Sequence, residues 1–486
     1  MFLMAKDMHY MLAGMPMAPE MLWGMAFEVI GLCLAMYGLT PATSNKSSSQ
    51  SVTVVSESAS LTLKHWWLIA AICIGLIIDV QKPATLGFVV PGMRSEYQIP
   101  NSTVAWLPFI ALIGTAMGSL AWGFLADFYG RRASIFLSAI MFVGTSICGA
   151  MPSFWWNVVM CWLMGLSAGG MLPVAYALLT ETMPAKHRSW ILVLTGATGA
   201  VGGYYVASEC SALLQSQFGW RILWFVNIPT GILLVILAFF LPESPKHLLA
   251  LGRIEEAEKI LRQFGGRLLT EAGMAAGLAA RWRLMPVMAS LTATALAWSI
   301  VNFGLLLWLP ADLVAKGYTV EAVSGLLAKS ALFGFGIVLL ACPLYSLWST
   351  KGTVALSALC TILGLLGILS IDWFGANIPA LGVMSLLIVG ACALLATLLP
   401  YSAELFPVSI RGRAMGWIAG CTKAGGILVQ ALALGGVAPQ IGLISTGVLL
   451  LLIGAVTGLV VFGVETRGRS IDGEADIAKA VAAQAG

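Results

Sequence analysis

Long apolar runs separated by short polar loops dominate the 486-residue chain. A membrane-spanning α-helix needs about 20 predominantly apolar residues, and twelve runs between Trp66 and Gly463 meet this requirement. They form two groups of six: 66–91, 102–126, 133–151, 154–180, 189–214 and 220–241, then 285–310, 321–347, 352–371, 378–403, 412–437 and 440–463. We therefore expect an all-α membrane protein with twelve transmembrane helices in two six-helix bundles.

Composition supports this class and excludes others. The chain is 59% hydrophobic with a mean hydropathy of +0.91, whereas soluble domains are roughly 45–50% apolar. Its net charge of +4 comes from cations scattered over short loops, without a basic stripe, so nucleic-acid binding is not expected. No nucleophile–base grouping, phosphate loop or metal-ligand spacing is present, which predicts neither an enzyme nor a cofactor or metal site.

The flanking segments divide the chain further. Residues 1–64 are an N-terminal extension with an expected additional helix from about Met21 to Leu39 and a Ser/Thr-rich linker. The two bundles occupy 65–241 and 285–464, joined by a loop at 242–284 and followed by a tail at 465–486. The loop contains a segment with the apolar spacing of a surface helix, Arg253 to Arg262.

The distribution of cations predicts the orientation. If the loop at 242–284 is cytoplasmic, 19 of the 26 Lys and Arg residues fall on that side, as the positive-inside rule requires. Both ends of the twelve-helix core should then be cytoplasmic, and Arg94, Arg221 and Lys316 should lie in the opposite loops.

An internal repeat supports the division into two halves. Glu181-Thr-Met-Pro-Ala-Lys-His-Arg188 recurs as Glu404-Leu-Phe-Pro-Val-Ser-Ile-Arg411, each time after the fourth predicted helix of a half. The offset is 223 residues. The repeat predicts two homologous bundles.

One loop carries a family resemblance. Gly123-Phe-Leu-Ala-Asp127-Phe-Tyr-Gly130-Arg131-Arg132 resembles the signature between helices two and three of the major facilitator superfamily. The stretches that begin at Pro242, Glu404 and Glu465 resemble those of its sugar porters, organic ion transporters and aromatic acid–proton symporters. This resemblance implies transport by alternating access. It also implies a cytoplasmic conformational gate, in which Asp127 helps to hold the bundles together near Arg411. The residues assigned to the gate are Gly123, Asp127, Gly130, Arg131, Arg132, Glu181, Arg188, Glu404 and Arg411.

Five charged residues lie inside predicted spans: Asp79, Lys82, Glu209, Lys329 and Lys423. A charge at mid-bilayer costs roughly 2.5–3.5 kcal/mol on insertion scales, so each needs a partner, a cavity or a function. Asp79 and Lys82, three residues apart, either neutralise each other or face the cavity. Three cations against two carboxylates favour an anionic ligand.

The resemblance extends to the transport site. Basic residues on helices eight and eleven contact the substrate in organic anion transporters, and Lys329 and Lys423 are similarly placed. Asn302 lies 223 residues after Asp79, while Trp106 belongs either to the pathway or to an interfacial belt. We expect substrate contacts from Lys82, Lys423, Lys329, Asn302 and Trp106, and proton transfer by Asp79 or Glu209.

Three functions are consistent with these features. The favoured one is a multi-pass secondary active transporter of the bacterial inner membrane that carries a small organic anion, such as an aromatic or other monocarboxylate, by symport with a proton. A sugar or polyol transporter is the alternative within the same fold, although the spans offer few amides beyond Gln430 and Asn302. A non-transporting membrane sensor or scaffold is the alternative of another class.

Overall fold

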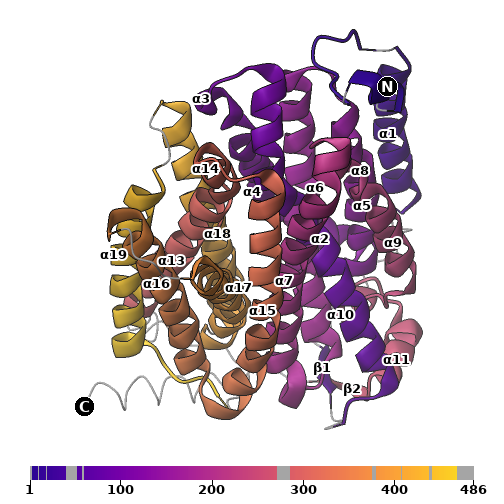
Figure 1. Cartoon of the computed structure of the whole chain (residues 1–486). Coiled ribbons are helices and arrows are strands. Elements are labelled where there is room, and N and C mark those ends of the chain that lie inside the picture. The colour runs from indigo at the N-terminus through magenta and orange to yellow at the C-terminus, as the bar shows by residue number, and fades with distance from the viewer. Residues whose placement is uncertain are drawn as a thin grey trace. The chain divides into compact units, whose positions relative to one another are not determined.

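The computed structural model describes residues 3–8, 10–17, 19–39, 52–56, 60–270, 285–374, 379–406, 408–436 and 440–467. Within these ranges, thirteen helices are long and apolar enough to cross a membrane (Figure 1). They comprise the twelve expected helices and one near the N-terminus. The predicted all-α membrane fold with an additional N-terminal helix is confirmed.

The chain forms two compact units. Unit 1 contains Met1–Arg188 and Val206–Gly273, and unit 2 contains Ser189–Tyr205 and Met274–Gly486. Helix α7 (Ala185–Phe218) therefore contributes its first part mainly to unit 2 and its second part to unit 1. The sequence analysis placed the whole of this helix in the first bundle.

Unit 1 contains most of the first six core spans and the N-terminal helix. Its other elements are η1 (Leu3–Met8), α1 (Pro19–Gly38), β1 (Val52–Ser56), α2 (Leu63–Tyr97), α3 (Asn101–Val104), α4 (Trp106–Tyr129), α5 (Arg131–Gly144), η2 (Thr145–Ala150), α6 (Phe154–Thr182), α8 (Ile222–Phe225), α9 (Asn227–Phe240), α10 (Pro245–Ala250), α11 (Ile254–Gln263) and β2 (Gly266–Thr270). Helix α11 confirms the predicted surface helix.

Helices α4 and α6 pack backbone against backbone because glycines line their contact. A Cβ atom on Gly165 would lie 2.0 Å from the carbonyl oxygen of Ala111, and one on Gly118 would lie 2.2 Å from that of Leu166. Small residues permit such close approach between membrane helices. The indole nitrogen of Trp122 donates to the Leu166 carbonyl at 2.8 Å, which ties the two helices further.

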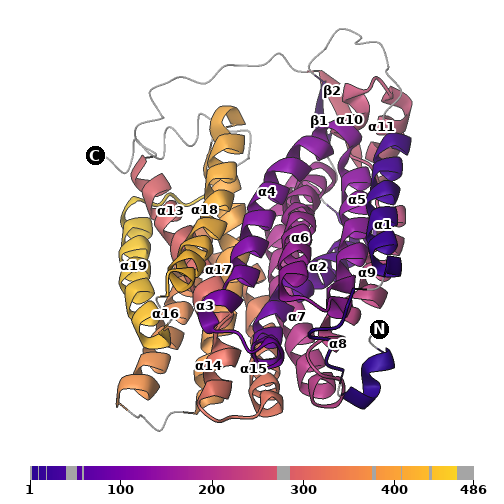
Figure 2. The same cartoon turned by 90° about the horizontal axis from the view of Figure 1, so that it is seen from above.

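A short antiparallel ribbon joins two segments that are far apart in the sequence. Val52 pairs with Thr270 and Ser56 pairs with Gly266, so β1 and β2 run side by side (Figure 2). No strand was predicted here, because β1 lies in the Ser/Thr-rich linker. Its short run, Val52-Thr-Val-Val, has the β-branched residues that favour strands.

Unit 2 contains the second six core spans. Its elements, besides the first part of α7, are α13 (Met285–Ile300), the π-helix η3 (Val301–Leu306), α14 (Leu309–Ala315), α15 (Val320–Pro343), the π-helix η4 (Leu344–Trp348), α16 (Thr350–Phe374), α17 (Ala380–Leu405), α18 (Val408–Leu434) and α19 (Ile441–Phe462). The continuous span predicted at 285–310 is thus interrupted by a π-helical turn, a feature often found at functional sites.

Candidate functional site

The turn between α4 and α5 depends on Gly130. This residue has a φ of 99°, a conformation that side chains disfavour. A Cβ atom at Gly130 would also lie 2.5 Å from the carboxylate of Glu243. Glycine therefore lets the chain turn and lets Glu243 approach the start of α5.

Glu243 caps the N-terminus of α5. Its carboxylate accepts hydrogen bonds from the amides of Arg131 at 2.7 Å and Arg132 at 3.3 Å. A negative charge at this position satisfies otherwise unpaired amides and interacts favourably with the helix dipole. The Arg132 guanidinium donates to the Phe239 carbonyl, 2.6 Å away at the end of α9. Glu243 was not among the predicted gate residues, although its Pro242-Glu-Ser-Pro context marked the segment.

Arg131 connects the turn to the end of α6. Its guanidinium lies 3.1 Å from an oxygen of Asp127 and 3.5 Å from an oxygen of Glu181. Glu181 also accepts a hydrogen bond from the Ser244 hydroxyl. The structure thus brings together three predicted gate residues, within unit 1.

The other predicted gate residues are placed as follows. Gly123 lies in α4, and no atom lies within 4 Å of the position that a Cβ atom would occupy there. Arg188 donates to the Met183 carbonyl at 3.4 Å. The expected approach of Asp127 to Arg411 joins residues of different units and stays a prediction. The side chain of Arg411 lies outside the described residues.

Unit 2 repeats the capping arrangement with different residues. Glu465 accepts hydrogen bonds from the amide and hydroxyl of Thr350, at 2.9 and 2.6 Å, at the start of α16. The Lys351 ammonium donates to the carbonyls of Val460 at 2.9 Å and Gly463 at 3.0 Å, at the end of α19. Glu465 therefore corresponds to Glu243, and Lys351 corresponds to Arg132.

Hydrogen bonding also sets the charge state of Glu465. Burial by itself raises the pKa of its carboxyl group. The hydrogen bonds from Ser349, Thr350 and the Arg467 amide outweigh burial, and the pKa is below its ordinary value. The cap on α16 therefore remains ionised at neutral pH.

Glu404 has a different environment from its repeat partner Glu181. Its carboxylate accepts hydrogen bonds from the hydroxyls of Ser189 at 2.5 Å, Tyr345 at 3.1 Å and Thr466 at 2.7 Å, all within unit 2. Glu181 instead lies beside the guanidinium of Arg131. The two halves share the carboxylate but not the charge of its neighbours.

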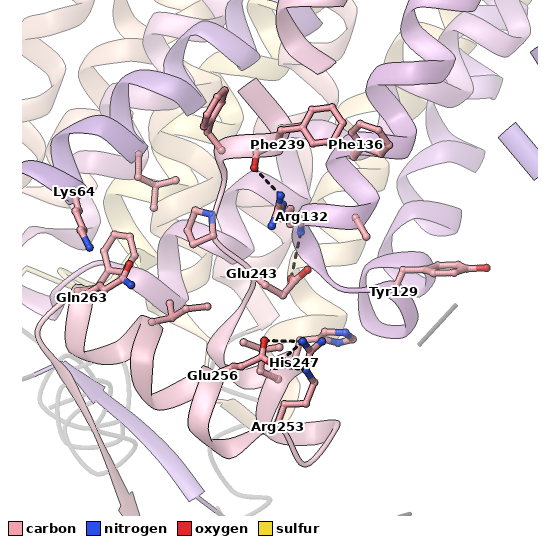
Figure 3. Close-up of a pocket in the computed structure, with 18 of the residues that line it drawn as sticks. Lys64, Tyr129, Arg132, Phe136, Phe239, Glu243, His247, Arg253, Glu256 and Gln263 are labelled. Atoms are coloured by element: carbon pink, nitrogen blue, oxygen red, sulfur yellow. Dashed lines mark hydrogen bonds and ion pairs between the residues drawn. The ribbon is translucent and has the colours of Figure 1, made fainter. Parts of the chain in front are cut away.

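A cleft of about 750 Å³ opens beside the α4–α5 turn of unit 1 (Figure 3). Lys64, Arg132 and Arg253 contribute positive charge to its lining, and Glu243 and Glu256 contribute negative charge. The last described residue after α1, Leu39, is also part of the lining.

His247, in the same cleft, gives the fold a pH dependence. Burial lowers the pKa of its imidazole below the usual 6.5, Arg131 acts in the same direction, and Glu243 and Glu181 oppose them. The unfolded chain therefore binds more protons than the folded chain, and stability falls as pH decreases from about 6.5 toward the pKa in the folded state. We expect His247→Gln to flatten the decrease in thermal stability between about pH 7 and pH 5.

Thermal unfolding of the purified protein in detergent at several pH values checks this expectation. His187→Gln is the control, because His187 is a half-buried histidine of α7 that does not line the cleft. An unchanged pH dependence in His247→Gln would contradict the assignment.

Lys82 is buried completely inside unit 1. Its ammonium group donates to the Phe142 carbonyl and to the hydroxyls of Thr145 at 2.7 Å and Ser146 at 2.9 Å. These contacts direct it toward α5 and η2, and its role as a substrate contact stays a prediction. Asp79 is also buried on α2, at 6% exposure.

The other predicted site residues of unit 1, Trp106 and Glu209, differ in exposure. Trp106 is exposed at the start of α4 and stacks edge-on against the exposed Trp155, 6.3 Å away. This placement is typical of the interfacial belt that the sequence left as an alternative. Glu209 is half-buried in the second part of α7.

In unit 2, α18 packs against the π-helical turn η3. The half-buried Lys423 places its ammonium group 5.8 Å from the ring centre of Phe303, next in sequence to the half-buried Asn302. Gln430 donates to the Phe303 carbonyl at 2.6 Å and accepts from the Trp308 indole at 3.1 Å. Two predicted site residues, Lys423 and Asn302, therefore lie in one region of unit 2, whereas Lys329 is exposed on α15.

Two helical units with matching caps at their helix ends and thirteen apolar helices within the described residues define a polytopic membrane protein. The chain belongs to the Major Facilitator Superfamily, whose family model matches residues 67–429.

Similar proteins match much of the chain. It is 25% identical to the niacin transporter NiaP of Acinetobacter baylyi, over 84% of this chain and 96% of that protein. It is 27% identical to the 4-hydroxybenzoate transporter PcaK of the same species, over 57% and 64% of the two chains. The inward-open xylose transporter XylE of Escherichia coli has a similar fold, with a TM-score of 0.66 and 17% identity over 86% of this chain and 99% of that one.

Proposed function

We propose that this protein is a secondary active transporter that moves a small organic anion, an aromatic or other monocarboxylate, together with a proton by alternating access. It would reside in the bacterial inner membrane, with both ends of the twelve-helix core in the cytoplasm. The observation that carries the proposal is the half-buried ammonium of Lys423 beside the Phe303 ring at a π-helical turn.

The chemistry of this pair suits an aromatic acid. An ammonium forms charge-assisted hydrogen bonds with a carboxylate, and an aromatic side chain stacks with a second ring in an offset or edge-on arrangement. Asn302, next to Phe303, adds an amide that can donate to the same ligand. Niacin and 4-hydroxybenzoate, named for two relatives, are aromatic monocarboxylates and support this class.

The sugar alternative finds less support. Both ends of the Gln430 amide bind groups of the protein, the Phe303 carbonyl and the Trp308 indole. The resemblance to xylose transporter structures, at 17% identity, concerns the fold alone. A carboxylate ligand is therefore preferred.

For proton coupling, we retain Asp79 and Glu209 as the proposed carriers. Both carboxyl groups lie in membrane helices, α2 and α7, where a protonated form avoids the cost of a buried charge. Lys329 remains a proposed second substrate contact on α15.

The direct test is uptake of radiolabelled nicotinate and 4-hydroxybenzoate into proteoliposomes, with and without an inward proton gradient. Lys423→Ala should weaken apparent substrate affinity about 10- to 100-fold, because a hydrogen bond to a charged group contributes about 1.5–3 kcal/mol. Lys423→Arg should retain more affinity than Lys423→Ala, since it keeps the charge.

Lys316→Ala is the control, because Lys316 pairs with Asp312 at the surface of the same unit. Uptake of both acids unchanged in Lys423→Ala would contradict the proposed role of Lys423. Competition by hexoses but not by acids would favour a sugar transporter instead.

A further inference from the structure

The segment that precedes α1 is hydrogen-bonded to the C-terminal end of α2. The amides of Leu12 and Ala13 donate to the carboxylate of Glu96, at 2.7 and 2.9 Å. The Tyr10 ring lies 5.8 Å from that of Phe218, the last residue of α7. Because α2 ends at Tyr97, these contacts place the N-terminal segment (described residues 3–8 and 10–17) at the C-terminal end of α2.

The chain after α1 lies at the other end of α2. Leu39 lines the same cleft as Lys64, in the first turn of α2, and Arg132, in the first turn of α5. Figures 1 and 2 agree that α1 runs beside α5, from the end of unit 1 near α8 toward the end that carries α10 and α11. At 1.5 Å per residue, its 20 residues extend about 30 Å, the thickness of the hydrocarbon core.

The surface of α1 is apolar, as expected of a helix in contact with lipid. Apolar side chains surround the helix instead of forming one stripe, and those turned away from the bundle include Trp23 at 65% exposure and Leu34 at 64%. A helix that is apolar on all sides must be buried in protein or in a membrane. The sequence of α1 contains two acidic residues and no Lys or Arg.

The cations of unit 1 identify the two faces of the membrane. Arg131, Arg132, Lys246, Arg253 and Lys259 lie at the end reached by Leu39, which the positive-inside rule assigns to the cytoplasm. At the opposite end, Lys6 and Arg94 are exposed, whereas Arg221 is buried in an ion pair with Glu96, so fewer free cations lie at this end than at the end reached by Leu39.

We infer that α1 is a thirteenth membrane-spanning helix that enters the bilayer from outside, with the N-terminal segment on the outer face and the outer side of α1 in contact with lipid. This topology keeps the start of α2 in the cytoplasm. It also explains how β1, which follows α1, can pair with β2 of the cytoplasmic loop. The outer segment would cover the buried Glu96 carboxylate and complete its hydrogen bonding.

The topology can be tested with single introduced cysteines in the full chain. Asp7→Cys reports on the N-terminal segment, where Asp7 is exposed. The matched controls are Ser95→Cys, exposed at the outer end of α2, and Lys259→Cys, exposed on α11. A membrane-impermeant maleimide is added to spheroplasts before and after permeabilisation, and labelling of the unmodified chain is subtracted to remove the signal of the native cysteines.

Asp7→Cys and Ser95→Cys should be labelled to the same extent before and after permeabilisation, whereas Lys259→Cys should be labelled only afterwards. Labelling of Asp7→Cys only after permeabilisation would overturn the inference, and so would an absence of labelling in both conditions. The result is independent of the transported substrate.

Discussion

Replacing Arg221 with alanine should lower the free energy of unfolding by about 3–5 kcal/mol, because it leaves the buried carboxylate of Glu96 without its cation. The Arg221 side chain is 1% exposed and forms a two-pronged contact with Glu96, at 2.7 and 3.2 Å. It also donates to the carbonyls of Gly149 and Met151 and to the Tyr97 hydroxyl. All three acceptors would lose the hydrogen bond from Arg221, although Tyr97 still donates to Met151 and Asn157 still donates to Tyr97. Thermal unfolding in detergent and the yield of monodisperse protein measure the effect.

Arg94→Ala is the matched control, since Arg94 is an exposed arginine near the same end of α2. It should change stability by less than about 0.5 kcal/mol. Arg221→Lys should recover only part of the loss, because an ammonium cannot reproduce the planar fork of the guanidinium. Equal stability of Arg221→Ala and Arg94→Ala would show that the buried pair does not stabilise the unit.

The second large effect is expected for Gly165→Ala. The added methyl group would lie 2.0 Å from the Ala111 carbonyl oxygen and 2.9 Å from the Thr115 amide nitrogen. Both are backbone atoms, so the conflict can be relieved only by separating α4 from α6. Overpacking costs typically 1–3 kcal/mol and occasionally more, and we expect a cost of roughly 3 kcal/mol here because the backbone must move. A lower melting temperature and reduced yield of folded protein would show it.

Gly454→Ala separates this effect from helix propensity. Gly454 is exposed on α19, and nothing lies within 4 Å of the position that its Cβ atom would occupy. Alanine is favoured over glycine in a helix by about 1 kcal/mol, so this control should be neutral or slightly stabilising. A Gly165→Ala protein as stable as Gly454→Ala would mean that α4 and α6 are not closely packed.

For the loop at 123–132, the motifs predicted the residues that form ion pairs but not the residue that caps α5. The sequence identified Asp127, Arg131 and Glu181, and the structure joins them through one guanidinium. It did not single out Glu243, which caps α5. The signal was present in the Pro242-Glu-Ser-Pro stretch, but only the folded chain shows that this stretch returns to the N-terminus of α5.

The charged residues inside the predicted spans show that their contacts could not be predicted from the sequence. Lys82 and Lys423 were both predicted to contact the substrate, Lys82 as an unbalanced charge inside a predicted span and Lys423 also from the family resemblance. The structure separates them: Lys82 bonds a carbonyl and two hydroxyls within unit 1, whereas Lys423 lies over an aromatic ring in unit 2. Arg221, assigned to an outer loop, lies in the turn between α7 and α8, where it is also among the most buried side chains.

The sequence by itself determined the membrane class, the spans and the two-fold repeat, because bilayer insertion depends on the summed hydropathy of about 20 consecutive residues and so is a local property. Only the tertiary structure decided which charge meets which partner, where the span predicted at 285–310 becomes a π-helix and where the N-terminal segment is anchored. Those outcomes depend on atoms from helices far apart in the sequence, such as Glu96 with Arg221 and Phe303 with Lys423. Hydropathy carries no information about such pairs, since it does not specify which faces of the helices meet.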